Sequence, residues 1–318
     1  MDFNRLFTSI EPLNWPKNIA YNHKLLSVGS CFSTEIGNIL LKHKFNIKIN
    51  PFGTIFNPIS MFHLLEQCIS LEQSQEHLFI HHHDLWYHYN WHSSIHAPSK
   101  DELIEKIEAI KINIHKWLKT TDYLILTFGT SIVRCLDHQV VNNCHKQPSK
   151  QFTKRFLEYD ELKTAFDNFY KKLLKFNPNT NLILTTSPVR HTKEGLIENS
   201  RSKALLQVFN QYVTSKNYNC LYFPSYEIMN DVLRDYRYYK PDLIHPSEEA
   251  VNVIWNFFVE GVLDEGSKHY LILMKKYLQM NNHVLLQPKS SSAKQFLLKK
   301  EKLKLKLEQE YWKNTFKN

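Results

Sequence analysis

Glycine and long apolar runs are scarce in this sequence. Only seven of its 318 residues are glycine, so a glycine that ends a short apolar run stands out. No apolar run approaches the roughly 18 residues that a membrane-spanning helix needs. The first residues also lack the basic segment and apolar stretch of a secretory signal. We therefore expect a cytoplasmic protein without a transmembrane segment.

Cysteine pairs and the common cofactor motifs are also missing. The five cysteines form no CxxC pair, which argues against a disulfide framework and against a zinc ribbon. The chain has neither the GxxxxGKS/T motif of P-loop proteins nor the GxGxxG motif of Rossmann domains. Residues 81–96 are rich in histidine, but no HExxH or Cys/His spacing accompanies them. We therefore expect neither a metal ion nor a cofactor.

Positive charge is unevenly distributed along the chain. The formal net charge is +9, yet residues 289–318 hold nine lysines against three glutamates, so the rest carries only about +3. Because most of the net positive charge lies in this tail, it does not indicate a nucleic-acid interface on the main domain. With 42% hydrophobic and 13% aromatic residues, the chain can bury a sizeable core.

A strand, a tight turn and a helix are predicted around Gly29. A short apolar run ends at this glycine, and apolar residues then recur at helical spacing, with Ser33 or Thr34 as the expected helix cap. Such a turn exposes a small side chain beside the helix amino terminus, where free N–H groups and the helix dipole favour negative charge. Ser30 and Cys31 are therefore candidate nucleophiles. Alternatively, both are ordinary small residues of a βα turn.

Strands and helices alternate along the rest of the chain. The predicted strands are 45–49, 122–128, 181–188 and 220–224, the predicted helices are 58–69, 99–120, 160–176, 200–215 and 248–262, and an aromatic hairpin is predicted at 79–91. This alternation indicates an α/β fold with a mostly parallel sheet. Ligands bind such sheets at the carboxyl ends of the strands, where Gly53, Gly129 and Arg190 fall.

An aspartate and a histidine lie three residues apart between two prolines. The segment Pro241-Asp242-Leu243-Ile244-His245-Pro246 precedes a predicted helix. In such a turn both side chains can point to one side, so that the carboxylate orients the imidazole and stabilises its charged form. Asp242 and His245 are thus a candidate catalytic pair. Alternatively, Asp242 only caps the turn.

Several collinear strings resemble one protein family. They are Gly29-Ser30-Cys31-Phe32-Ser33, Asn50-Pro51-Phe52-Gly53, Leu126-Thr127-Phe128-Gly129-Thr130, Asn143-Cys144-His145-Lys146, Ser187-Pro188-Val189-Arg190-His191, and Arg234-Asp235-Tyr236-Arg237-Tyr238-Tyr239 followed by Asp242-Leu243-Ile244-His245-Pro246-Ser247. Together they are similar to the GSCFA-domain family, within the SGNH (GDSL-type) hydrolase superfamily, over roughly residues 22–262. The resemblance implies an SGNH-like, three-layer α/β/α fold.

The resemblance also implies which residue is the nucleophile. Aligning the glycines places Cys31 on the nucleophilic serine of the superfamily and Ser30 on the aspartate before it. A shift by one residue would instead make Ser30 the nucleophile. If Cys31 lies at a helix start near His245, we expect its thiol pKa to fall into the range of about 3.5–7.5 seen for activated cysteines.

The third sequence block departs from the superfamily pattern. The superfamily has Gly-x-Asn there, whereas this chain has Gly129-Thr130-Ser131, so the amide donor of the oxyanion hole is missing. Losing one such donor typically slows acyl transfer about 10²–10³-fold. Either another donor replaces it or activity is low. The candidate replacements are Thr130, Ser131, Asn57 and Asn143, and the other expected donors are the N–H groups of the first turn and of Gly53.

Three functions are open at this point. The leading hypothesis is an acyl-ester hydrolase or acyltransferase that acts on a small-molecule or glycan ester, such as an acylated carbohydrate. The second is a catalytically degraded SGNH module that binds a glycan or an anionic ligand through Arg190, Arg234 and Arg237. The third is a protein that acts chiefly through its tail, which can contact another chain or an anionic surface.

The composition changes sharply near the carboxyl end. Residues 1–265 are predicted to form the GSCFA domain, and residues 266–318 a helical, lysine-rich extension with a linker at 288–292. We expect the chain beyond Gln287 to be dispensable for the catalytic fold. The apolar residues of the predicted tail helix are Phe296, Leu303, Leu307 and Trp312.

Overall fold

A parallel sheet forms the centre of the protein. A computed structural model describes residues 8–311 of the chain, except for residues 12, 14, 16 and 218. The sheet order is β10-β9-β5-β1-β2, and each neighbouring pair of strands is parallel. The strands are β1 (Lys24–Gly29), β2 (Asn46–Ile49), β5 (Tyr123–Phe128), β9 (Asn181–Thr186) and β10 (Cys220–Tyr222). β5 is buried along its whole length, as expected for a central strand of a parallel sheet.

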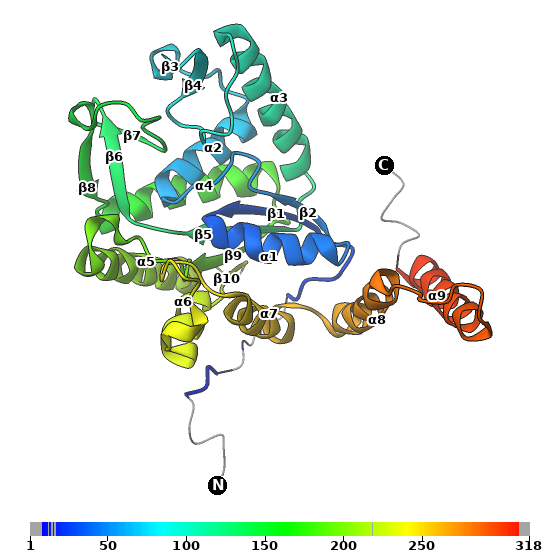
Figure 1. The fold of residues 1–318 in the computed structure, drawn as a ribbon. Helices are drawn as coiled ribbons and strands as arrows, with labels where there is room; N and C mark the ends of the chain where they lie inside the picture. The colour runs from blue at the N-terminus through cyan, green and yellow to red at the C-terminus, as the bar shows by residue number, and fades with distance from the viewer. Residues whose placement is uncertain (1–7, 12, 14, 16, 218, 312–318) are drawn as a thin grey trace.

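Helices cover both faces of this sheet, as Figure 1 shows. One face packs against α2 (Pro58–Ser70), α3 (Lys100–Leu118), α4 (Tyr159–Phe176) and α5 (Leu196–Lys216). The other face packs against α1 (Cys31–Lys42), α7 (Glu248–Val262) and α8 (Glu265–Asn282). Leu126 of β5 lies in the first core and Ile125 in the second, because successive side chains of a strand point to opposite faces. The predicted three-layer α/β/α fold is confirmed.

Two small antiparallel sheets lie outside the central sheet. β3 (Phe79–His82) and β4 (Leu85–His88) form the predicted aromatic hairpin, in which His83 and Asp84 adopt left-handed backbone conformations at the turn. β6 (Ile132–Leu136), β7 (Gln139–Val141) and β8 (Thr153–Phe156) form a sheet that was not predicted. Its strands are too short to show a clear alternation in the sequence.

The remaining helical segments differ in part from the expectation. α1 is capped by Ser30 rather than by Ser33 or Thr34, because the helix begins directly after the turn. α5 begins at Leu196, four residues before the predicted start. A short helical segment, α6 (Ser225–Glu227), continues into a π-helix at Ile228–Leu233, and 3-10 turns lie at Glu76–Leu78, Ser149–Gln151, Thr192–Glu194 and Tyr236–Tyr238.

The C-terminal extension is helical, as predicted. α8 buries Tyr270 in the second core, and α9 (Ser291–Glu310) packs on α8 and buries Leu307 completely. The ring of Tyr311, just after α9, lies 4.8 Å from that of Tyr21 and 5.0 Å from that of Tyr270. Trp312 lies outside the described residues. The domain boundary at residue 265 stays a prediction.

Candidate active site

The turn between β1 and α1 holds its serine inside the protein. The Ser30 hydroxyl accepts a hydrogen bond from Phe32 N at 3.3 Å as the N-cap of α1, and it donates to Ser187 Oγ at 2.8 Å. The Ser30 N–H donates to Thr127 O at 3.1 Å. The side chain is fully buried. Ser30 therefore has a structural role in which both its hydroxyl and its N–H are engaged.

Gly29 allows this turn to lie close against β5. A Cβ atom on Gly29 would lie 2.4 Å from Thr127 O, well inside van der Waals contact. The Gly29 N–H donates to Asn50 Oδ1 at 2.8 Å, and its carbonyl accepts from Ile55 N at 3.0 Å. The turn is thus fixed by β5 and by the loop that follows β2.

Cys31 is the first residue of α1 and is only half-buried. Burial raises the pKa of its thiol; the nearby Glu35 carboxylate adds to this, while the Cys31 backbone N–H and Lys240 oppose it. The net shift is upward, so the expectation of a lowered pKa was wrong. Desolvation of the thiolate outweighs the stabilisation that a helix amino terminus provides.

Asp242 and His245 form a hydrogen-bonded pair. His245 Nδ1 lies 2.7 Å from Asp242 Oδ2, and Asp242 Oδ1 accepts the N–H groups of Ile244 at 2.9 Å and of His245 at 3.0 Å. These backbone hydrogen bonds and the His245 side chain hold the pKa of Asp242 well below its usual value. An ionised Asp242 keeps the imidazole hydrogen on Nδ1 and leaves Nε2 free to accept a proton.

An ion pair connects this loop to α1, the helix that begins at Cys31. Lys240 Nζ lies 3.1 Å from Glu35 Oε1, which belongs to the first turns of α1. Within the described residues, no hydrogen bond joins the Cys31 thiol to the His245 ring. The link that the structure shows between α1 and this loop is therefore the Lys240–Glu35 ion pair.

Arg190 braces the same loop from the segment after β9. Its N–H donates to Ile244 O at 3.2 Å, and its guanidinium donates to Leu243 O at 3.4 Å. The guanidinium carbon lies 4.1 Å from the centroid of the Tyr239 ring and 5.2 Å from that of Tyr236. Substrate binding by Arg190 stays a prediction, whereas its contacts show that it holds the backbone on which His245 lies.

The main-chain N–H groups of Gly53 and Gly129 already donate hydrogen bonds to carbonyl groups of the protein. Gly53 N–H donates to Asn50 O at 2.8 Å, which closes a turn. Gly129 N–H donates to Phe56 O at 2.7 Å, and Thr130 N–H shares this acceptor at 3.0 Å. Neither Gly53 nor Gly129 therefore offers a free N–H group in this structure.

The side chains that were expected to replace the missing asparagine are engaged as well. The Thr130 hydroxyl lies 3.0 Å from Ser202 Oγ, and the Ser131 hydroxyl donates to Ser202 O at 3.3 Å. Asn57 is the N-cap of α2, where its Oδ1 accepts from Ser60 N at 2.8 Å and its Nδ2 lies 3.0 Å from Ser60 Oγ. These residues shape the loops around the site.

Asn143 and Arg237 contact other segments. Asn143 Oδ1 accepts from His145 N at 3.0 Å, and its own N–H donates to Tyr89 O at 2.9 Å beside the aromatic hairpin. Arg237 is exposed and pairs with Asp235 at 3.5 Å. In the described part of the chain, no hydrogen bond or ion pair brings either residue to Cys31.

Two residues near Gly129 were not given a role from the sequence. Lys203 is fully buried, and its Nζ donates to Gly129 O at 2.6 Å and to Ser187 O at 2.7 Å. Burial lowers the pKa of Lys203 to about 7. The other residue is His191, whose ring edge faces Gly129. The buried face of a helix is normally apolar. The polar residues on the buried face of α5, which include Lys203, were therefore the sequence feature that could have pointed to Lys203.

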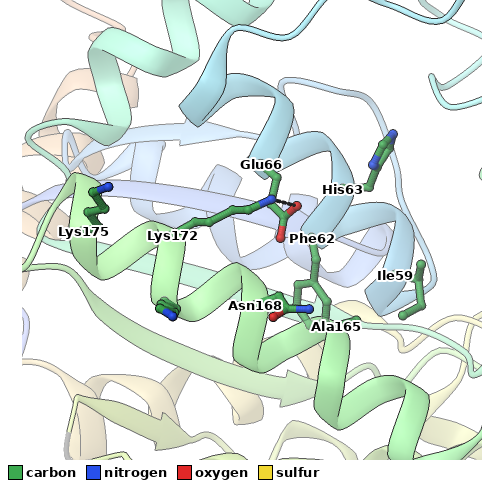
Figure 2. A pocket seen from close by; sticks show the side chains of 9 residues that line it. Ile59, Phe62, His63, Glu66, Ala165, Asn168, Lys172 and Lys175 are labelled. Carbon is green, nitrogen blue, oxygen red and sulfur yellow. Dashed lines mark hydrogen bonds and ion pairs between the residues drawn. The ribbon is translucent and has the colours of Figure 1, made fainter.

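A separate cavity lies between α2 and α4, as Figure 2 shows. Its volume is about 660 Å³, and its lining includes Phe62, His63, Lys171 and Lys172. Lys172 points across it to Glu66, with an ion pair of 2.7 Å. None of the candidate catalytic residues lines this cavity.

The fold and the site define an α/β protein in which an ion pair joins the helix after the Gly29 turn to the loop that carries Asp242 and His245. Residues 24–258 match the GSCFA family, so the chain belongs to the GSCFA family. No curated protein matches the chain. A solved structure titled as a carbohydrate esterase family 3 from Talaromyces cellulolyticus is similar at 12% identity, over 52% of this chain and 65% of that chain, with a TM-score of 0.29.

Two further findings concern metals and membranes. Among the described residues, no three His, Cys, Asp or Glu side chains are grouped to hold a metal ion, and this includes the histidine-rich segment 81–96. In the same part of the chain, no helix combines the length and the apolar composition needed to cross a membrane.

Proposed function

We propose that this GSCFA protein is an acyl-ester hydrolase or acyltransferase. Cys31 is the nucleophile, His245 the general base, and Asp242 the group that orients His245. The observation that carries the proposal is the 2.7 Å Asp242–His245 pair on a loop that Lys240 joins to the first turns of α1, where Cys31 lies. The burial and hydrogen bonding of Ser30 favour Cys31 over Ser30 as the nucleophile.

The reaction starts from a neutral thiol, because burial raises the pKa of Cys31. As the sulfur bonds to the carbonyl carbon, Nε2 of His245 takes the thiol proton and the C=O electrons move onto oxygen. When the C–O bond to the alcohol breaks, His245 returns this proton to the leaving oxygen. Water or an acceptor hydroxyl then attacks the thioester on Cys31 while His245 takes its proton. The C–S bond breaks, His245 returns the proton to the Cys31 sulfur, and the acid is released or the acyl group is transferred.

An acylated carbohydrate is the substrate that we propose. Tyr236 and Tyr239 flank the Arg190 guanidinium beside the catalytic loop, so aromatic faces and hydrogen-bond donors occur together there. Sugars offer apolar C–H faces and hydroxyl groups that suit such a mixed surface. A small acyl group on a sugar hydroxyl would reach Cys31 while the ring contacts these side chains.

Covalent labelling tests the proposal directly. The protein is treated with a fluorophosphonate and, separately, with p-nitrophenyl acetate, and each modified residue is mapped by mass spectrometry. We expect acetylation of Cys31 and release of p-nitrophenol, both lost in Cys31→Ala. The control Cys144→Ala, which removes another half-buried free thiol, should acetylate normally. Serine labelling would move the nucleophile to Ser30, and absence of labelling would contradict an enzymatic role.

The alternative is a catalytically degraded module that binds a glycan or an anionic ligand. The raised pKa of Cys31 favours it, as do the engaged N–H groups of Gly53 and Gly129. If this alternative holds, the protein binds acetylated oligosaccharides in calorimetry without cleaving them. Arg190→Ala would then weaken binding, while Cys31→Ala would not.

A further inference from the structure

His191 has a buried ring nitrogen without a partner. It lies in the segment after β9, where its N–H donates to Asn199 Oδ1 at 2.9 Å and fixes the backbone. Its ring meets the Phe56 ring edge to face, with centroids 5.2 Å apart. His191 Nε2 is buried and makes no hydrogen bond with the described residues. Leaving such an atom unpaired typically costs about 1–3 kcal/mol, so this nitrogen calls for an explanation.

This nitrogen points at Gly129. Gly129 begins the sequence block in which the SGNH superfamily has an oxyanion-binding asparagine and this chain has none. A Cβ atom on Gly129 would lie 2.9 Å from His191 Nε2 and 3.1 Å from Phe56 O. Glycine at this position therefore leaves room for the edge of the imidazole ring. The Arg190 N–H, one residue earlier, donates to Ile244 O next to His245, so His191 lies between the Gly129 strand end and the catalytic loop.

The protonation state of His191 suits a neutral donor. Burial lowers the pKa of His191 to about 3, and the electrostatic effects of the nearby Lys203, His245 and Lys193 side chains act in the same direction. At pH 7 the ring is neutral and carries one hydrogen. In the described part of the chain no protein group bonds to Nε2, so the ring hydrogen can occupy this nitrogen.

We propose that the His191 Nε2–H group donates a hydrogen bond to the oxyanion formed when Cys31 attacks an acyl carbonyl. This inference rests on the proposed acyl-transfer function. It assigns to His191 the place of the missing asparagine amide, because Gly53, Gly129 and the Thr130 and Ser131 side chains are already engaged.

The donor acts on a charge that exists only during the reaction. The carbonyl oxygen gains a full negative charge as the S–C bond forms, and loses it when the C–O bond to the alcohol breaks. The neutral N–H has no protein partner to give up, and because its Nε2 is buried, the acyl group must displace neighbouring atoms to reach it. The main-chain N–H of Cys31 lies at the start of α1, where the helix itself does not use it, and can serve as the second donor.

The test separates acyl transfer from thiol alkylation. Acetylation by p-nitrophenyl acetate passes through an oxyanion, whereas alkylation of Cys31 by iodoacetamide is a displacement at carbon without one. His191→Phe keeps a ring in the same space but removes the N–H, and His191→Asn keeps a side-chain donor. His269→Ala, on the exposed side of α8, serves as the control.

We expect His191→Phe to acetylate about 10²–10³-fold more slowly than the native protein, with an unchanged iodoacetamide rate. Its melting temperature should be equal or higher, because an unpaired buried nitrogen is replaced by carbon. His191→Asn should retain more activity than His191→Phe, and His269→Ala should match the native protein in both reactions.

Three results would overturn the inference. Equal acetylation rates in native protein and His191→Phe would remove His191 from the site and leave the Cys31 mechanism standing. A parallel loss of acetylation and alkylation in both variants would show that His191 only supports the fold. A native protein that alkylates at Cys31 but never acetylates would overturn the acyl-transfer function, and the oxyanion role would fall with it.

Discussion

The two halves of the candidate site are built differently. The Cys31 turn is continuous with the core: Ser30 is fully buried and bonded to Ser187, and Gly29 lies against β5. In the Asp242–His245 loop the two side chains are 44% and 36% exposed. The loop is held by backbone hydrogen bonds such as Lys240 N–H to His245 O at 2.7 Å, by Arg190 and by one exposed ion pair. In the proposed mechanism, the nucleophile is thus positioned by the same packing that stabilises the fold, whereas the base is positioned by a surface loop.

This difference predicts two patterns of mutational effect. Changes in the turn should alter stability and rate together, because each side chain there also contributes to the core. Changes in the loop should alter rate with little effect on stability, because exposed pairs contribute little to the free energy of unfolding.

Removal of the nucleophile should have the largest effect. Cys31→Ala should reduce turnover by a factor on the order of 10⁵–10⁶, as loss of the nucleophile does in well-studied hydrolases. Cys31→Ser should keep part of the activity, because a hydroxyl can still attack with His245 as base. Ester turnover by the purified variants, with thermal melting as the fold control, measures both.

Ser30→Ala is the matched variant within the turn. It removes the N-cap of α1 and one of the two donors to Ser187 Oγ, so unfolding should become easier by about 0.5–2 kcal/mol. Its turnover should remain well above that of Cys31→Ala. The reverse ranking would make Ser30 the nucleophile and would contradict the structural role that its hydrogen bonds indicate.

The next largest effect is expected in the loop. Asp242→Asn removes the charge that orients and stabilises the imidazole, so turnover should fall by about 10⁴, still less than in His245→Ala. The melting temperature at pH 7 should change little, because both side chains are partly exposed. A large loss of stability in Asp242→Asn would show that the loop belongs to the folded core. It would contradict the expected difference in stability effects between the turn and the loop.

The sequence was sufficient to predict the parts of the site that depend on local pattern. The apolar run before Gly29 predicted β1, and the helical spacing after it predicted α1. The Asp242–His245 spacing predicted a pair that the structure places at 2.7 Å. Each of these features lies within a few neighbouring residues, where backbone geometry limits the possible arrangements.

The rest depends on contacts between distant residues. The pairing of Ser30 with Ser187 favoured Cys31 as the nucleophile, and no pattern within either segment encodes it. The oxyanion role proposed for His191 depends on the contact of its ring with Gly129, which His191 reaches from the segment after β9. The upward pKa shift of Cys31 also needs the structure, since burial and charge depend on the packed neighbours.

Arg190→Ala should have an intermediate effect. Without the guanidinium, Leu243 O loses a donor and the loop loses its contact with Tyr239, so His245 should be less well placed. Displacing a catalytic group by about 1 Å can cost about 10²-fold in rate. Turnover should fall by up to this factor, with a small change in melting temperature. The control is Arg201→Ala, which removes an exposed arginine of α5. Equal turnover in Arg190→Ala and Arg201→Ala would show that the contacts of Arg190 are not needed to position His245.

The smallest effect on turnover is expected from the C-terminal extension. Truncation after Gln287 removes α9, which packs on α8 and the second core but contacts neither Cys31 nor the Asp242–His245 loop. The truncated protein should melt cooperatively at a lower temperature and hydrolyse esters at the native rate. It should also bind polyanions such as heparin less tightly and with less salt dependence, because a net charge of +6 is lost.

Two leucine substitutions on α9, one buried and one exposed, test whether packing of α9 accounts for the loss of stability on truncation. Leu307 is fully buried, so Leu307→Ala should cost about 2–5 kcal/mol, whereas Leu298 is 64% exposed, so Leu298→Ala should cost little. Chemical denaturation of both full-length variants measures the difference. If the truncated protein is insoluble, or if Leu307→Ala lowers turnover as well as stability, then α9 supports the catalytic fold itself. The predicted boundary at residue 265 would then be wrong, because the extension would belong to the same cooperative unit as the nucleophile turn.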